Sequence, residues 1–310
     1  IIVDEFSMVD TWLANQLFSN ISSNSKILIV GDSDQLPSVS PGQVLADLLQ
    51  IPTIPQTRLE RIYRQSEEST IVTLASHIRQ GILPADFTQK KADRSYFEIA
   101  SNHIPASIEK ILGAAIRSGI PARDIQVLAP MYRGTAGIDA INQLMQDLLN
   151  PPQKDQLSFE APQCHYRTGD KVIHLVNDAE VNVFNGDLGY ITDLIPGKYT
   201  ESKQDEIMID FDGNEVSYPR NEWYKIRLAY AMSIHKSQGS EFPVVILPIT
   251  SASKRMLERN LIYTAITRAK SKLILLGEIQ AFDYATQHIG TARKTYLIER
   301  FSDLIESTDG

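Results

Sequence analysis

IIVDE, at residues 1–5, joins three apolar residues to two adjacent carboxylates, Asp4 and Glu5. Such a run predicts a buried β-strand that ends at the two acids. Apolar residues at helical spacing follow at 9–21, and a second short apolar strand is expected at 26–30. This order is typical of a parallel α/β sheet, whose functional side chains gather at the carboxyl ends of the strands. The two acids should therefore lie at the same edge as the residues that follow the second strand.

A buried strand that ends in Asp-Glu is also the Walker B pattern of nucleoside triphosphatases, in which one carboxylate lies near Mg²⁺ and the other acts on a water molecule. That pattern is accompanied upstream by a P-loop, Gly-x-x-x-x-Gly-Lys-Ser/Thr. None occurs in the 310 residues. We therefore expect the chain to be a C-terminal fragment of a larger protein. Taken alone, the pair Asp4-Glu5 would equally suit a solvated strand end.

The composition is that of an ordinary cytoplasmic chain of one to three domains. The single cysteine, Cys164, excludes an internal disulfide, and no apolar run is long enough to span a bilayer. The six histidines are scattered and suggest no zinc site. The net charge of −8 argues only weakly against nucleic acid, because binding depends on where the cations lie.

The α/β pattern resumes after a helix at 69–80 and an expected linker at 82–94. Strands and helices are predicted to alternate at 96–100, 104–117, 125–129 and 138–149, with later strands at 244–248 and 273–276. Residues 165–225 differ, because hairpin signals occur at Asn185-Gly186 and Asp212-Gly213. We predict that this stretch is a small antiparallel β-barrel inserted into the second α/β domain.

Three further polar segments adjoin predicted strands or helices. Residues 31–37, GDSDQLP, form a strand-end loop in which Gln35 could sense a γ-phosphate, although a plain polar loop is the alternative. Residues 235–241, HKSQGSE, suit phosphate contact, although a plain loop before a strand would also fit. Residues 260–270, NLIYTAITRAK, place Arg268 on a packed helix, either as an arginine finger or as a cation near the helix dipole.

Taken in order, the four segments resemble superfamily 1 helicases, and YAMSIHKSQGSEF with YTAITRAK resembles the RecD-type branch, superfamily 1B. The same likeness is seen in GDSDQLPSVSPGQVLADLL, IYRQSEESTI, LAPMYRGTAGI and FNGDLG. It covers nearly the whole chain and is nearest to RecD-like helicases of the exodeoxyribonuclease V alpha chain type.

This resemblance implies an α/β fold of two RecA-like P-loop NTPase motor domains, with ATP and Mg²⁺ between them and single-stranded DNA across the top. The expected domains are a partial first motor domain at 1–88, a second at 89–164 plus 226–310, and an inserted SH3-like β-barrel at 165–225. A first domain without its central strand should expose apolar faces and strand edges.

The resemblance also implies roles for the residues that match its motifs. Asp4 would hold the Mg²⁺ of the nucleotide, Glu5 would be the catalytic base, and Gln35 would sense the γ-phosphate. The other expected catalytic and nucleotide-binding residues are Arg64, Arg268, Glu241 and Gly239. The expected DNA-binding residues are Ser233, His235, Lys236, Ser237, Gln238, Arg133 and Thr135.

The sequence thus predicts an ATP-dependent 5′-to-3′ helicase or translocase on single-stranded DNA, involved in DNA repair or recombination. A single-stranded-DNA-binding protein or other repair proteins would be further partners. Without a P-loop, this chain alone should be inactive. The alternative is a catalytically silent nucleic-acid-binding or scaffold module, which the retained Glu5, Gln35, Arg64 and Arg268 argue against. An RNA helicase of the same superfamily is a third alternative, although nothing in the sequence indicates recognition of a 2′-hydroxyl. No Asp, Glu and Lys cluster supports a nuclease.

Overall fold

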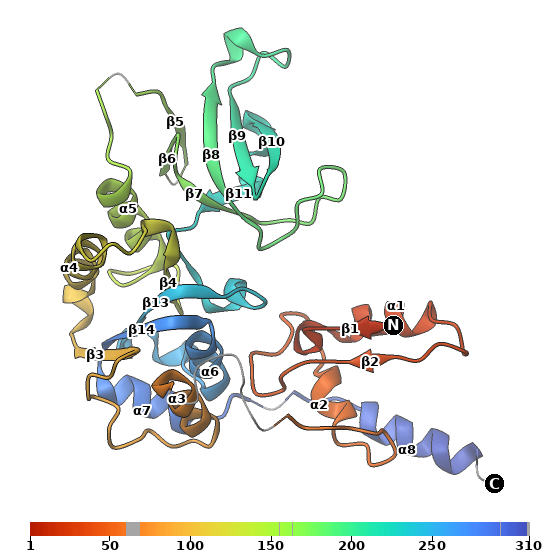
Figure 1. Ribbon diagram of the computed structural model, residues 1–310. Coiled ribbons are helices and arrows are strands. Elements are labelled where there is room, and N and C mark those ends of the chain that lie inside the picture. Colours follow the sequence, from red (N-terminus) through yellow and green to blue (C-terminus); the bar gives the residue numbers. More distant parts are fainter. Residues whose placement is uncertain (60–68, 155, 163, 292, 309–310) are drawn as a thin grey trace.

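The computed structural model describes the chain except for residues 60–68, 155, 163, 292 and 309–310, and for the side chains of 305–308. Three bodies are visible in Figure 1. We name them the first unit (residues 1–51 with the last helix), the central unit (residues 70–149 and 229–288) and the insert (residues 158–228). The predicted α/β fold that carries an inserted antiparallel sheet is confirmed.

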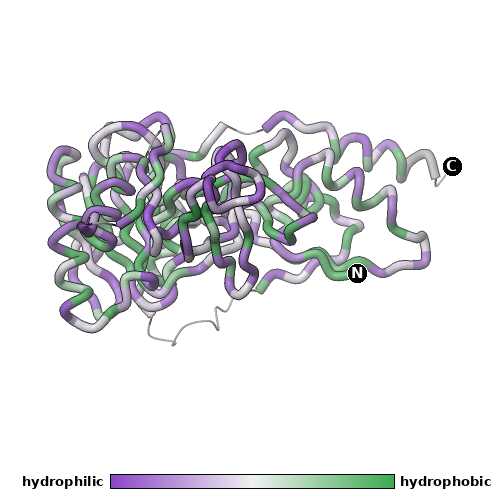
Figure 2. Tube along the Cα trace, turned by 90° about the horizontal axis from the view of Figure 1, so that it is seen from above, coloured by the Kyte–Doolittle hydropathy of each residue, from purple (hydrophilic) through white to green (hydrophobic). Residues whose placement is uncertain are grey.

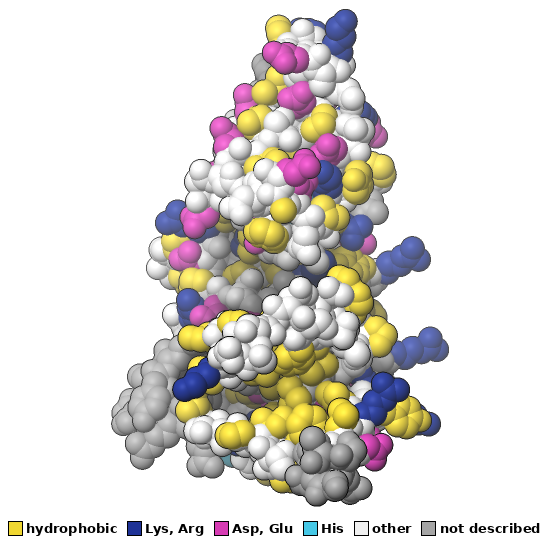
Figure 3. Space-filling model, turned by 90° about the vertical axis from the view of Figure 1, so that its right-hand side faces the viewer, with side chains coloured by type: hydrophobic (Ala, Val, Ile, Leu, Met, Phe, Trp, Pro, Cys, Tyr) yellow, Lys and Arg dark blue, Asp and Glu magenta, His cyan; other side chains and the backbone are white. Residues whose placement is uncertain are grey.

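The first unit holds a two-stranded parallel sheet in which Val3 lies opposite Ile29. Its elements are β1 (Ile2–Val3), α1 (Thr11–Ser19), β2 (Leu28–Ile29) and α2 (Val44–Leu48). A small core forms around Phe6, but other apolar side chains stay outside it. Those of Ile2, Trp12 and Leu28 are 73%, 69% and 56% exposed. Figure 3 shows hydrophobic side chains gathered in the lower half of this side of the molecule, as expected for a sheet of so few strands.

The central unit is an all-parallel sheet with helices on both faces. Its strands, in spatial order, are β12 (Ala231–Ser233), β4 (Ile125–Ala129), β13 (Phe242–Ile249), β14 (Ala269–Gly277) and β3 (Arg94–Glu98). Its helices are α3 (Thr70–Arg79), α4 (Ile104–Arg117), α5 (Ile138–Leu149), α6 (Arg259–Thr267) and α7 (Ile279–Gln287). Alternate residues of β13 face opposite cores: Ile246 packs with α4 and α5, whereas Val245 packs with α3, α6 and α7. Both faces are buried, which explains why the strand is apolar throughout.

The insert is antiparallel. Its main sheet has the order β10 (Asn214–Pro219), β9 (Glu206–Phe211), β8 (Leu188–Ile195), β7 (Lys171–His174) and β11 (Ile226–Leu228), and β5 (Ser158–Ala161) pairs with β6 (Cys164–Arg167). The predicted hairpin turn at Asp212-Gly213 joins β9 to β10. The sheet continues past residue 225, because β11 pairs with β7. Among the described residues no ladder joins β10 to β11, so we describe an antiparallel sheet and not a closed barrel.

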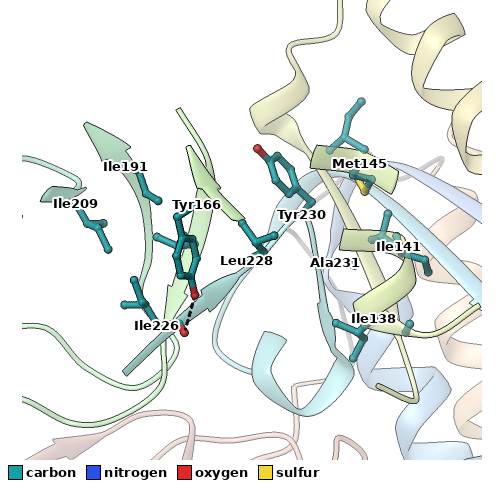
Figure 4. Packing of buried hydrophobic residues seen from close by; sticks show 14 of the residues in the cluster. Ile138, Ile141, Met145, Tyr166, Ile191, Ile209, Ile226, Leu228, Tyr230 and Ala231 are labelled. Atoms are coloured by element: carbon teal, nitrogen blue, oxygen red, sulfur yellow. Dashed lines mark hydrogen bonds between the residues drawn. The ribbon is translucent and has the colours of Figure 1, made fainter. Parts of the chain in front are cut away.

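One continuous core joins the insert to the central unit. Figure 4 shows Ile141 and Met145 of α5 on one side, Ile191 and Ile209 of the insert on the other, and Tyr230 between them. The insert therefore packs on the sheet of the central unit through shared apolar contacts.

A buried carboxylate, that of Asp170, forms hydrogen bonds at the junction between the insert and the central unit. Asp170 has no exposed surface. Its Oδ2 accepts hydrogen bonds from Gln146 Nε2 at 2.6 Å and Arg167 N at 2.7 Å, and its Oδ1 accepts from Asn150 Nδ2 at 2.8 Å and the Tyr230 hydroxyl at 3.0 Å. Burial raises the pKa of Asp170, while these donors partly oppose that shift. Because the donors come from both bodies, Asp170 connects the insert to the central unit.

The chain crosses between the first and central units twice. It leaves the first unit between α2 and α3, and it returns between α7 and α8 (Leu297–Thr308). α8 lies beside α2, and Leu297 packs on the core of the first unit. Figure 2 accordingly shows both termini at one end of the molecule. None of the described helices is long and apolar enough to cross a membrane.

A buried histidine gives the insert a dependence on pH. His174 has no exposed surface, and its Nδ1 lies 2.7 Å from the Tyr218 hydroxyl oxygen. Its Nε2 has no hydrogen-bond partner among the described residues. Burial lowers the pKa of His174. The nearby charges that also act on it are Asp187 and Asp178, which raise it, and Lys225 and Lys236, which lower it further.

Lowering the pH from about 7.5 to about 5.5 should therefore destabilise the insert. An unfolded histidine has a pKa of about 6.5, so the unfolded chain takes up a proton that the folded insert accepts only at lower pH. Stability should fall as the pH drops below about 6.5, and His174→Phe should flatten that slope. The measurement is urea unfolding followed by Trp223 fluorescence in a Trp12→Phe background, with the exposed His103→Gln as control. An unchanged slope in His174→Phe would contradict this assignment.

Candidate functional site

The two carboxylates directly follow β1. Asp4 Oδ1 accepts a hydrogen bond from Glu5 N at 2.8 Å, and Phe6 N donates to Val30 O at 2.9 Å. Parallel pairing of β1 and β2 thus places the acids beside the loop that follows β2, as the sequence predicted. Glu5 has a φ of 52°, in the left-handed region that side chains other than glycine rarely adopt. Such strained positions cluster at functional sites.

Gly31 allows the next loop to lie flat against this turn. An ideal Cβ at Gly31 would stand 2.9 Å from Leu45 Cδ2 and 3.1 Å from Phe6 N and from Ser7 N. A side chain at position 31 would therefore crowd Leu45 and the backbone of the turn that follows Glu5. The glycine allows the start of the loop to pass close to that turn.

The loop at 32–36 belongs to the first unit but is bound by α6 of the central unit. Helix positions three and four apart share one face, and the bonds to the loop follow this spacing. The bonds are Asn260 Nδ2 to Gln35 O at 3.1 Å, the Tyr263 hydroxyl to Asp32 Oδ2 at 2.8 Å, and Leu36 N to Thr264 Oγ1 at 2.8 Å. One face of α6 thus fixes the loop across the junction.

Arg268 extends this contact to the side chain of Gln35. Arg268 caps the end of α6 and is only 3% exposed. Its Nη2 donates to Gln35 Oε1 at 3.2 Å, its Nη1 to Ser240 O at 3.1 Å, and its Nε to Thr264 O at 3.2 Å. The structure therefore joins two predicted site residues that lie far apart in the sequence.

The segment that follows β12 crosses the sheet from one edge to the other. Ala231 of β12 pairs with Val127 of β4, and Val127 pairs in turn with Ile246 of β13. β13 itself begins earlier, at Phe242. Because β12 and β13 run in parallel, the chain between Ser233 and Phe242 must return from the carboxyl edge to the amino edge. It ends beside Ser240, whose carbonyl oxygen Arg268 binds.

The side chains of three predicted DNA-binding residues form hydrogen bonds within this segment or with the first unit. Ser233 caps the short turn by accepting from Lys236 N at 3.3 Å. Ser237 has no exposed surface, and its hydroxyl donates to Ile234 O at 2.8 Å. Gln238 Nε2 donates to Leu36 O at 2.7 Å, so it adds to the bonds that hold the loop at 32–36.

Lys236 and His235 remain near the carboxyl edge. Lys236 Nζ donates to Asn185 Oδ1, in the predicted turn of the insert. Burial lowers the pKa of both Lys236 and His235. The contact between Lys236 and Asn185 was missed by sequence reasoning, although the segment FNGDLG was already part of the resemblance.

Arg133 and Thr135 follow the neighbouring strand, β4, and are exposed. Thr135, Met131 and Ser253 are among the residues that line a small cavity of about 30 Å³. Since β4 and β12 are adjacent and parallel, these two residues and Lys236 follow the same edge of the sheet.

The remaining predicted residues lie at the opposite edge or outside the described chain. Glu241 Oε2 pairs with Lys270 Nζ at 3.1 Å, and Gly239 has a φ of 75°. Arg64 lies outside the described residues. Within the part of the chain that the structure describes, no group of three or more His, Cys, Asp or Glu side chains could hold a metal ion.

Solved structures share this architecture. A Pif1 helicase from Candida albicans matches with a TM-score of 0.52 over 98% of this chain and 76% of its own, at 19% identity. Pif1 from Bacteroides bound to single-stranded DNA matches with a TM-score of 0.53 over 99% and 75%, at 18% identity. The chain therefore shares the RecA-like α/β fold of these proteins.

Sequence comparisons indicate which kind of helicase the chain resembles. Family models match residues 1–101 as an AAA domain, 141–211 as an ATP-dependent RecD-like DNA helicase SH3 domain, and 228–276 as a UvrD-like helicase C-terminal domain. The ATP-dependent RecD2 DNA helicase of Deinococcus radiodurans is 33% identical over 97% of this chain. The RecBCD enzyme subunit RecD of Mycolicibacterium smegmatis is 28% identical over 89%.

The chain is thus similar to RecD-like helicases along nearly its whole length, as its motifs indicated. It spans 39% of the length of the RecD2 helicase and 50% of that of the RecD subunit.

Proposed function

We propose that this chain forms part of an ATP-dependent 5′-to-3′ DNA helicase or translocase that acts in DNA repair or recombination. The observation that carries the proposal is the hydrogen bond between the Arg268 guanidinium and Gln35 Oε1. It sets a cation from one α/β unit against an amide from the other, in the loop that follows the strand paired with β1. This is the arrangement that phosphoryl transfer between two motor domains requires.

The donor set suits a nucleotide with Mg²⁺. Carboxylates are the usual protein ligands of Mg²⁺, and Asp4, which is exposed, would hold the ion together with the phosphates. Bound MgATP would supply the phosphoryl group that water accepts. Glu5 would orient that water, Gln35 would contact the γ-phosphate, and Arg268 would stabilise negative charge. The assignments of Glu241 and Gly239 to the nucleotide rest on their place before β13.

Single-stranded DNA is the proposed ligand of the carboxyl edge. Arg133, Thr135, His235 and Lys236 all follow strands that end there, and cations and hydroxyls are the usual partners of phosphate. Ser237 and Gln238 would act indirectly, because the same segment runs from Lys236 to the carbonyl group that Arg268 binds. Movement of this segment would connect the DNA surface to the nucleotide site. A single-stranded-DNA-binding protein remains an expected partner.

The test is to produce the protein as its gene encodes it and to measure phosphate release from ATP with single-stranded DNA, with RNA of the same sequence, and without nucleic acid. We expect DNA to stimulate hydrolysis most. Displacement of a blocking protein from the 3′ end but not from the 5′ end of the strand would support 5′-to-3′ movement. Binding of DNA without any hydrolysis would overturn the proposal in favour of a silent binding module.

Lys236→Ala should weaken DNA binding more than it slows turnover. A lysine that contacts one phosphate contributes affinity that depends on salt but not on sequence. Its loss should reduce the slope of log affinity against log salt by about 0.7 for a single strand, while turnover at saturating DNA stays near normal. Binding is measured by fluorescence anisotropy over a salt series. Lys110→Ala, on the outer face of α4, is the control. An unchanged slope would remove Lys236 from the DNA surface.

A further inference from the structure

The loop of the first unit at residues 32–42 is held at both ends by parts of the chain that follow the insert. Its first half contains Gln35 and is bound by α6 and Gln238. Its second half is bound by Arg293, which lies in the segment that returns from α7 to α8. No motif in the sequence marks Arg293.

Arg293 binds the backbone of this loop through both of its terminal nitrogens. Nη1 donates to Ser40 O at 2.8 Å and to Gly42 O at 2.6 Å, and Nη2 donates to Ser38 O at 2.6 Å. Nη1 also lies 3.3 Å from Ser38 Oγ. A guanidinium offers several donors in fixed directions, whereas a lysine offers one compact ammonium. The chemistry therefore requires arginine at this position.

The opposite side of the loop is pressed against α1. Gly42 has a φ of 117°, and an ideal Cβ there would lie 2.2 Å from Thr11 Oγ1. Pro41 O also accepts from Thr11 N at 3.1 Å. The loop is thus enclosed between the start of α1 and the Arg293 guanidinium.

The segment that presents Arg293 is itself fixed on α6. Arg259 N donates to His288 O at 2.8 Å. An ideal Cβ at Gly290 would lie 2.0 Å from Glu258 Oε2, so the chain passes in close contact with the start of the helix. The same helix therefore sets the position of Arg268, which binds the Gln35 side chain, and of the segment that holds the far end of the Gln35 loop.

We propose that Arg293 is a positioning residue for the Gln35 loop. By holding residues 38–42 it keeps Gln35 Oε1 within reach of Arg268, and it acts through the loop backbone. The inference rests on the proposed function, since it treats Gln35 as the γ-phosphate sensor.

The structural part is tested by hydrogen exchange on this chain. Arg293→Ala should accelerate exchange at the amides of Thr11 and Leu36, because their hydrogen bonds to Pro41 O and to Thr264 Oγ1 attach the loop to α1 and to α6. Arg293→Lys should restore little of the protection, and the exposed neighbour Lys294→Ala should leave exchange unchanged. Unchanged exchange in Arg293→Ala would overturn the proposal whatever the activity.

The functional part is tested by a double-mutant cycle on the protein as its gene encodes it. Arg293→Ala should lower kcat for DNA-stimulated ATP hydrolysis by roughly tenfold, since misplacement of a catalytic group by about 1 Å can cost up to a hundredfold. KM for ATP should change little. In a Gln35→Ala background the further loss should disappear, because the loop then has no sensor to position.

The outcomes separate this inference from the proposed function. Equal losses in both backgrounds would make Arg293 a residue that only stabilises the fold, and would overturn the inference. Absence of any DNA-stimulated hydrolysis in the unsubstituted protein would overturn the proposed function and, with it, the sensor role given to Gln35. Rapid exchange together with a loss that depends on Gln35 would support the inference.

Discussion

In the protein as its gene encodes it, replacing Arg268 by alanine is expected to reduce DNA-stimulated ATP hydrolysis by a factor of about 10³ or more, the contribution that arginine fingers typically make. The guanidinium is almost fully buried and binds the Gln35 side chain across the junction between units. Its loss would remove both the cation and the group that orients Gln35. Initial rates at saturating ATP and DNA measure kcat, and DNA affinity should change far less.

Two controls distinguish catalysis from stability. Arg268→Ala also leaves Ser240 O and Gln35 Oε1 without their donor, which should cost about 1–3 kcal/mol of stability. The rate must therefore be expressed per folded molecule, with unfolding measured in parallel. Arg268→Lys keeps the charge but not the forked donor, so it should recover stability better than turnover. Near-normal turnover in Arg268→Ala would identify a structural residue at the end of a helix.

Asp170→Ala should be the most destabilising single substitution at the junction between the insert and the central unit. It removes a fully buried acceptor from four donors, of which Gln146 Nε2 and Asn150 Nδ2 keep a second acceptor in His165 O and Thr168 O. A buried donor left without an acceptor typically costs about 1–3 kcal/mol. Chemical unfolding followed by circular dichroism and by Trp223 fluorescence measures the change in free energy.

The matched control is Asp139→Ala, an exposed acid in the first turn of α5. It should change stability by no more than about 0.5 kcal/mol. Asp170→Asn tests the role of the acceptors, because its amide group turns a donor toward other donors. If Asp170→Ala unfolds at the same denaturant concentration as Asp139→Ala, the junction is held by the apolar core and not by the carboxylate.

Local patterns predicted most of the central unit. Helices expected at 104–117 and 138–149 form as α4 and α5 over those residues, because each repeats apolar residues along one face. The strand expected at 125–129 is β4. The strand expected at 96–100 begins earlier, at Arg94. The sequence placed this charged residue in a linker, but its side chain is buried. The exposed apolar faces of the first unit were also predicted.

The contacts between units could not be read from the sequence in the same way. The sequence motifs identified Gln35 and Arg268 as candidate site residues. Their hydrogen bond, however, depends on how α6 packs against the first unit. Asp170 lies in a stretch, RTGDK, that reads as an ordinary turn, and its importance comes from donors spread over three segments. Arg293 acts through carbonyl oxygen atoms, which every residue has, so no pattern of side chains in the loop could reveal it.

The return of α8 to the first unit limits how the first and central units can move. A body attached to another at two separate points cannot translate freely or twist about any direction, and the motion that stays easy is rotation about the line through both points. Atoms near that line move little and atoms far from it move most. One of these attachments is the segment that returns from α7 to α8, and Arg293 lies in it. On opening, the Arg293 contacts should therefore persist, while contacts far from this attachment separate.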